Sequence, residues 1–193
     1  MSELLLIALG AALVNNFVLV QLLGVCPFMS GSQRVEGAIG LSLAMALVLT
    51  IAAGATQLVD LYVLRPYRLE YLRLFALLLV IGAAVGLTEL AVRRLAPLLQ
   101  RVLGLYIPFV ATNCAVLGVA LINTTASRSF VAAMFYGTGA ALGFGLALTL
   151  FAGLRERVAL ADVPVTFRGA PITFITAGIL SLAFMAFAGF ARL

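Results

Sequence analysis

Six apolar stretches of about twenty residues fill this chain, and they constrain its fold more than any other feature. A helix of that length crosses the hydrocarbon core of a bilayer, where every backbone polar group must be bonded inside the protein. The predicted spans are 4–23, 37–59, 70–92, 102–122, 129–154 and 170–191. We therefore expect an all-α integral membrane protein with six transmembrane helices, the first of them retained rather than removed as a signal peptide.

The charge content of the chain supports this fold. Hydrophobic residues make up 64% of the 193 residues and charged residues 10%, and every cationic side chain is an arginine. The arginines are scattered between the apolar stretches, which is typical of span ends and argues against nucleic acid as a partner. One transmembrane domain over 1–193 is expected. The predicted side without the termini carries the larger number of arginines, so the positive-inside rule puts the termini outside the cytoplasm.

The two halves of the chain resemble each other at an offset of 97 residues, which places Asn16 on Asn113. Repeat one would cover about 1–92 and repeat two about 98–193. Three spans per half is an odd number, so the repeats would be inverted in the membrane. Paired polar or interrupted spans in such repeats often mark the functional centre.

The first and fourth predicted spans are longer than a straight helix needs. No charged residue occurs over 4–33 or over 102–127. Both stretches carry polar residues in their middles, notably Asn15, Asn16 and Asn113. Helices 1 and 4 are therefore expected to be broken.

Two cysteines are the residues best suited to carry chemistry. The chain has no histidine, no nucleophile motif and no paired carboxylates, which argues against hydrolysis. A single cysteine is most often a small buried hydrophobe, so a packing role for each stays open. Cys26 lies between Gly24 and Pro27, which break helices, and Cys114 follows Asn113. A helix break beside a thiol at membrane depth is costly, and packing alone does not explain it.

Two thiolates are half of the set that an iron–sulfur cluster usually needs, so a partner chain would have to supply the other half. In a straight helix Cys26 would lie roughly 15 Å beyond Asn16, whereas Cys114 directly follows Asn113. Thiols that share one cluster must converge within a few ångströms. That requires either that the Gly24–Pro27 segment folds back into the membrane or that the helices are broken.

Two GxxxG motifs, Gly82 to Gly86 and Gly139 to Gly143, predict close helix packing within the chain or with a partner.

Several longer strings carry a family resemblance that covers nearly the whole chain. They are Val14–Val20, Leu23–Met29, Thr112–Leu121, Arg155–Arg157, Ala161–Pro164, Phe167–Gly169 and Ile175–Gly178. Together they resemble the A subunit of the Rnf ion-translocating oxidoreductase. The E subunit of the sodium-pumping NADH:quinone reductase is homologous, but the first two strings are closer to the Rnf form.

The resemblance implies a bacterial inner-membrane protein that pairs with a homologous E subunit in the opposite orientation. Each chain would give two cysteines to one [2Fe–2S] cluster inside the membrane, and the ligands here would be Cys26 and Cys114. The supporting residues would be Gly24, Pro27, Asn15, Asn16 and Asn113. The complex would move electrons between NADH and ferredoxin, coupled to sodium or proton movement.

Two other functions stay open from the residues alone. The chain could be an inverted-repeat transporter of a small solute or ion, with the polar residues of spans one and four lining its site. It could also be an assembly subunit without a cofactor.

Overall fold

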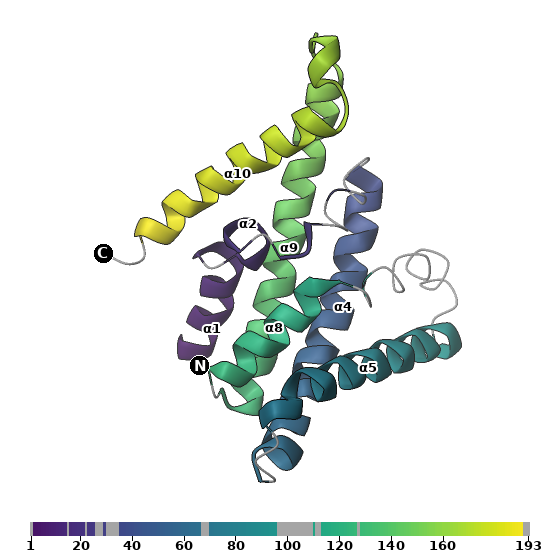
Figure 1. Cartoon of the computed structure of the whole chain (residues 1–193), viewed down its shortest axis with the longest axis vertical. Coiled ribbons are helices and arrows are strands. Elements are labelled where there is room, and N and C mark those ends of the chain that lie inside the picture. The colour runs from purple at the N-terminus through teal and green to yellow at the C-terminus, as the bar shows by residue number, and fades with distance from the viewer. Residues whose placement is uncertain are drawn as a thin grey trace.

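Two long helices, α4 (Val35–Val59) and α9 (Phe130–Ala159), form the axis of the computed structural model of this chain (Figure 1). They lie side by side and make the most extensive contact between described elements. The structure describes residues 2–14, 16–21, 23–25, 29, 35–66, 70–95, 110, 113–126 and 128–190.

Shorter elements surround this axis. The N-terminal part is α1 (Ser2–Leu9), the π-helix η1 (Gly10–Val14) and α2 (Phe17–Val20). Helix α8 (Cys114–Thr125) packs on α4, while α5 (Arg73–Leu95) and α10 (Ala170–Phe190) point away from the axis on opposite sides in Figure 1. Three short helical elements complete the description: η2 (Asp60–Leu64), η3 (Glu70–Leu72) and η4 (Val165–Phe167).

The helices agree with the predicted membrane fold. Among the described residues, three helices are long and apolar enough to cross a membrane: Val35–Leu64, Arg73–Arg94 and Phe130–Ala159. Three shorter apolar helices fall in the remaining predicted spans: Leu6–Val20, Cys114–Thr125 and Ala170–Ala186. The all-α membrane fold is thereby confirmed, and the count of six spans stays a prediction.

Small residues bring α4 and α9 together. A Cβ on Gly137 would lie 2.7 Å from the Cβ of Ala53 and 3.4 Å from the carbonyl oxygen of Leu49, so glycine allows α9 to approach the α4 backbone. Large side chains fill the space beside this contact, and the rings of Phe17 and Phe144 stack with their centroids 6.4 Å apart. The core therefore lies where α2 and α4 both meet α9.

The two GxxxG motifs have different environments. Gly139 and Gly143 of α9 face the backbone of α1 and η1, where a Cβ on Gly143 would lie 2.7 Å from the carbonyl oxygen of Ala12. Gly82 and Gly86 of α5 have no atom within 4 Å of an added Cβ. The α9 motif therefore packs the first helix inside the chain, and the α5 motif faces open space.

A buried carboxylate closes the corner between α4 and α5. Asp60 is fully buried, with one oxygen 2.9 Å from Arg65 Nε and the other 3.6 Å from Arg73 Nε. A buried charge needs such partners, because removing it from water without them costs several kcal/mol. Asp60 directly follows the predicted span 37–59.

Replacement of Gly139 by alanine should destabilise the chain, because the new methyl group would overlap the backbone of Ala8 in α1. We expect a loss of about 1–3 kcal/mol, seen as a lower midpoint of thermal unfolding by circular dichroism in detergent. Gly82→Ala is the matched control, since it adds a methyl group in open space and should leave the midpoint unchanged or raise it slightly. Equal midpoints for the two variants would contradict the close packing of α1 on α9.

Candidate functional site at two helix breaks

Asn16 occupies the break in the first helix. Its backbone is extended (φ −62°, ψ 105°), so it separates η1 from α2. Its side-chain oxygen accepts from the Val18 amide at 3.1 Å, while its side-chain nitrogen donates to the carbonyls of Ala12 (3.1 Å) and Gly143 (2.8 Å). Backbone groups freed at a break inside a membrane protein need such partners. The predicted interruption of the first helix is therefore present, and one asparagine stabilises it.

Asn113 starts α8 in the same way. Its backbone is extended (φ −82°, ψ 122°), and its side-chain oxygen accepts from the Ala115 amide at 3.0 Å. Its side-chain nitrogen lies 3.7 Å from the sulfur of Met45 in α4. The two asparagines are thus N-caps 97 residues apart, and each contacts the long helix of the other half of the chain. The division into two repeats stays a prediction.

Gly24 folds back onto the start of α8. Its amide donates to the sulfur of Cys114 at 3.2 Å, across 90 residues of sequence. Gly24 is buried with φ +84°, and an added Cβ would lie 3.0 Å from the Cβ of Ala115 and 3.2 Å from the side-chain oxygen of Asn113. A side chain would be strained here both by the backbone angle and by these neighbours, so the position requires glycine.

The preceding residue supports the same fold-back. The Leu23 amide donates to the Phe17 carbonyl at 3.2 Å, which reverses the chain directly after α2. The side chain of Leu23 covers Gly118, where an added Cβ would lie 2.9 Å from Leu23 Cδ1. The turn after α2 therefore rests on the first two turns of α8.

Cys114 is a free, exposed thiol in the first turn of α8. The amino end of a helix carries a partial positive charge, which favours a negatively charged group there. The Gly24 amide donates a hydrogen bond to the same sulfur. Among the residues that the structure describes, this site presents one accessible sulfur, with a backbone amide donating to it.

The structure brings together part of the predicted site. Gly24, Asn113 and Cys114 are in mutual contact, and Asn16 bonds to α9 at the other break. Three predicted residues lie outside the described residues: Cys26, Pro27 and Asn15. The role of the cysteines as ligands stays a prediction.

Sequence reasoning missed a polar cluster where α4, α8 and α9 meet. The Gln57 amide donates to the Arg128 carbonyl at 2.6 Å, and the Arg128 guanidinium donates to the Asn123 side-chain oxygen at 3.0 Å. The same guanidinium lies 4.0 Å above the ring of Tyr136. Gln57 and Asn123 are fully buried. Polar residues inside apolar helices normally face the protein interior, and that signal could have revealed the cluster.

Comparison with known proteins gives full-length matches. A family model described as "Rnf-Nqr subunit, membrane protein" matches residues 4–191. A protein of Pseudomonas aeruginosa (strain LESB58) is 57% identical over 193 residues, and one of Aliivibrio fischeri is 53% identical over 193 residues, with 100% of each chain covered in both cases. A protein of Azoarcus sp. (strain BH72) is 54% identical over 189 residues, covering 98% of both chains. All three relatives are named as the A subunit of an ion-translocating oxidoreductase complex.

Loss of the Asn16 side chain should destabilise the break. Asn16→Ala leaves the Val18 amide and the Gly143 carbonyl without this partner, so we expect a loss of about 1–3 kcal/mol and a lower thermal midpoint. Asn16→Ser can still cap α2 but lacks the amide donor to Gly143, so its midpoint should lie between those of the alanine variant and the parent. A parent-like midpoint for Asn16→Ala would show that the break is stable without this side chain.

Proposed function

Because this chain belongs to the Rnf-Nqr family of membrane subunits, we propose that it is an electron-transfer subunit of a redox-driven ion translocase in the bacterial inner membrane. The names of its full-length relatives support a component of such a complex rather than an enzyme that works alone. The multi-pass helical fold supports a location in the membrane. The termini lie on the periplasmic side in this proposal, in keeping with the distribution of arginines.

Cys26 and Cys114 are the ligands that this chain contributes to a [2Fe–2S] cluster in this proposal. A homologous E subunit in the opposite orientation supplies the other two thiolates. The observation that carries the assignment is the hydrogen bond from the Gly24 amide to the Cys114 sulfur at 3.2 Å. Cys26 follows Gly24 by two residues, and two residues of extended chain span about 7 Å at most.

The described residues fit such a cluster in three respects. The Cys114 sulfur is exposed at the start of α8, so a ligand from a second chain can reach the same metal. The helix terminus and the Gly24 amide both stabilise negative charge on this sulfur. The surrounding helices are apolar, and a low-dielectric environment with few hydrogen bonds is one of the means by which proteins set cluster potentials.

Asn113 and Gly24 contribute to the proposed site in different ways. Asn113 fixes the first turn of α8 through its bond to the Ala115 amide, which holds the Cys114 backbone in place. Gly24 provides the amide and the tight turn that lets it approach. A bound cluster would accept and release single electrons, and hydrogen bonds to its thiolates would adjust the potential at which it does so.

Replacement of either cysteine should remove the cluster while the chain still enters the membrane. Cys26→Ala or Cys114→Ala in the purified complex should lower iron and acid-labile sulfide by about two atoms each and abolish one electron paramagnetic resonance signal. Thr125→Ala on the exposed end of α8 is the control and should change neither quantity. Unchanged iron and electron flow in the cysteine variants would refute the assignment. Solute uptake by liposomes that hold the thiol-free chain alone would favour a transporter instead.

Replacement of Gly24 by alanine should alter the cluster environment. The backbone angle costs about 1–2 kcal/mol for a residue with a side chain, and the methyl group would press on Ala115, so the amide would move away from the Cys114 sulfur. We expect a shifted reduction potential or a broadened resonance signal in the complex. Gly10→Ala adds a methyl group in open space and should leave both unchanged. A parent-like potential and spectrum in Gly24→Ala would exclude a role for this amide.

A further inference from the structure

Helix α2 has four residues, so it cannot bond all of its own carbonyl groups. The carbonyl of Phe17 accepts from the amides of both Gln21 and Leu23, at 3.3 and 3.2 Å. The second bond takes the Leu23 amide, which in a continuing α-helix would bond to the carbonyl of Leu19. Leu19 is buried, and its carbonyl therefore needs a partner from another part of the protein.

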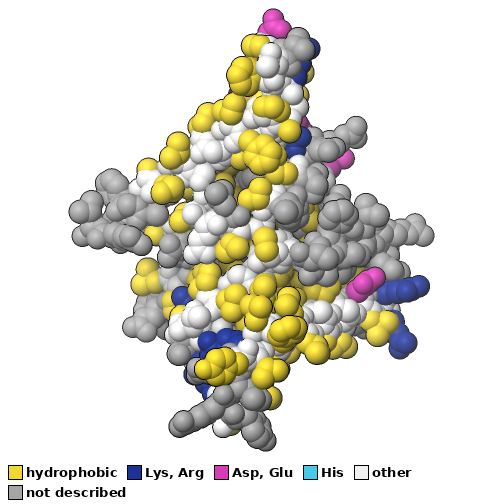
Figure 2. All heavy atoms as spheres, in the orientation of Figure 1, with side chains coloured by type: hydrophobic (Ala, Val, Ile, Leu, Met, Phe, Trp, Pro, Cys, Tyr) yellow, Lys and Arg dark blue, Asp and Glu magenta, His cyan; other side chains and the backbone are white. Residues whose placement is uncertain are grey.

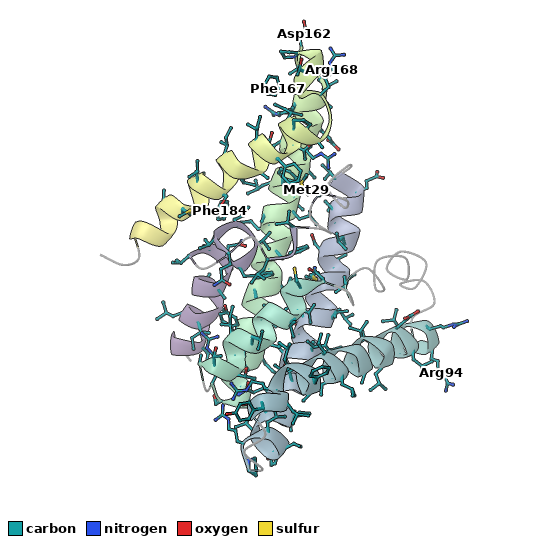
Figure 3. All side chains as sticks on the ribbon, viewed as in Figure 1. Met29, Arg94, Asp162, Phe167, Arg168 and Phe184 are labelled. Carbon is teal, nitrogen blue, oxygen red and sulfur yellow. The ribbon has the colours of Figure 1, made fainter. Side chains whose placement is uncertain are left out.

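That partner comes from α10. The hydroxyl of Ser181 donates to the Leu19 carbonyl, across 162 residues of sequence. Helix α10 lies against α2 and η1, and Phe184, labelled in Figure 3 on the same part of α10, belongs to the buried core. Ala177 and Leu180 pack against this core as well. Ser181 therefore lies on the face of α10 that meets the rest of the chain.

The other side of α10 is apolar and exposed. Ile175, Ile179 and Leu182 are exposed there, and Figure 2 shows hydrophobic side chains along this projecting helix. In a membrane these side chains lie at the lipid-facing surface of the chain. The attachment of α10 to the bundle thus rests on one face, to which the Ser181 hydroxyl contributes a polar contact.

The Ser181 bond differs from the usual behaviour of hydroxyl groups in the described helices. On the same helix, Thr173 and Thr176 each donate to the carbonyl four residues earlier, at 2.7 Å. The same bond to the preceding turn is made by Ser42, Thr50, Thr56, Thr88, Thr125, Thr138 and Thr149. For Ser181 that acceptor would be the carbonyl of Ala177. Its hydroxyl bonds to α2 instead and so joins two helices.

Both ends of α2 are thereby attached to other helices. Asn16 bonds to a carbonyl of α9 at the start of α2, and Ser181 bonds to the carbonyl of Leu19 near its end. Gly24 follows Leu19 by five residues and donates its amide to the Cys114 sulfur at 3.2 Å. Helix α8, with twelve residues, bonds most of its carbonyls internally, so α2 depends more on its neighbours for its position.

We propose that Ser181 is a positioning residue for the cluster site, because by holding the end of α2 it keeps the Gly24 amide on the Cys114 sulfur. The effect on the cluster rests on the proposed function, whereas the link from Ser181 to Gly24 does not involve iron. A hydrogen bond to a thiolate ligand favours the more negative, reduced state of a cluster, so its loss lowers the reduction potential. Through this hydroxyl, α10 influences the potential of a site that it does not contact.

Hydrogen exchange, followed by mass spectrometry of the purified complex, tests the link between Ser181 and Gly24. Ser181→Ala should speed exchange of the Gly24 amide by about threefold or more, as expected for the loss of one hydrogen bond between helices. Ser181→Thr keeps a hydroxyl donor and should exchange at the parent rate. Thr176→Ala removes a hydroxyl that bonds within the chain's own helical turn and should also match the parent. Equal rates in Ser181→Ala and the parent would overturn the inference.

Redox titration of the same complexes tests the effect on the cluster. Ser181→Ala should lower the potential of the resonance signal that Cys114→Ala removes, and Ser181→Thr should restore it. In a Gly24→Ala background the potential should shift no further on adding Ser181→Ala, because the amide is already displaced.

The outcomes separate this inference from the proposed function. A parent-like potential in Ser181→Ala would overturn the positioning role and leave the cysteine assignment intact, as would an equal shift in Thr176→Ala or in Ser181→Thr. A signal that survives Cys114→Ala would refute the proposed function, and the effect on the potential with it, whatever the exchange of the Gly24 amide.

Discussion

The amide side chain of Asn16 is the interaction on which the central part of this structure depends. A helix that stops inside an apolar bundle exposes backbone groups that have no water to bond with. Asn16 satisfies three such groups at once, the Val18 amide and the carbonyls of Ala12 and Gly143. The Gly143 bond also ties the break to α9, so the position of α2 follows from that of the axis. The fold-back after α2 and the contact of Gly24 with Cys114 both build on this placement.

Much of the architecture could be predicted because hydropathy alone determines which segments enter the bilayer. The interruption of the first helix at Asn16 was also accessible, since a polar pair in the middle of an overlong apolar stretch is costly unless it bonds to backbone groups at a break. The two GxxxG motifs were indistinguishable in sequence, and only the packing of α1 on Gly139 and Gly143 separates them from the open pair on α5. The sequence of each motif cannot show whether it is packed or open, because that depends on which other helix lies against it in the fold.

The candidate site was likewise predictable in its residues but not in the contacts between them. Asn113 and Gly24 could be singled out as a polar and a flexible residue beside cysteines. The bond from the Gly24 amide to the Cys114 sulfur joins segments 90 residues apart, and no rule based on sequence spacing predicts it. The polar cluster of Gln57, Asn123 and Arg128 was missed for a related reason. These residues lie near predicted span ends, where polar side chains are usually exposed, whereas Gln57 and Asn123 are fully buried.

The bond between Asn16 and Gly143 also bears on biogenesis. The two residues are separated by 127 positions, so at 5–20 residues per second the ribosome needs roughly 6–25 s to deliver the acceptor after the donor. During that interval the Asn16 side-chain nitrogen can bond to the Ala12 carbonyl but lacks its Gly143 acceptor. An N–H group without a partner is costly inside the membrane, so water or another polar group would bond to it until α9 is in place. The break at Asn16 therefore gains its full set of hydrogen bonds only after the α9 segment has been synthesised.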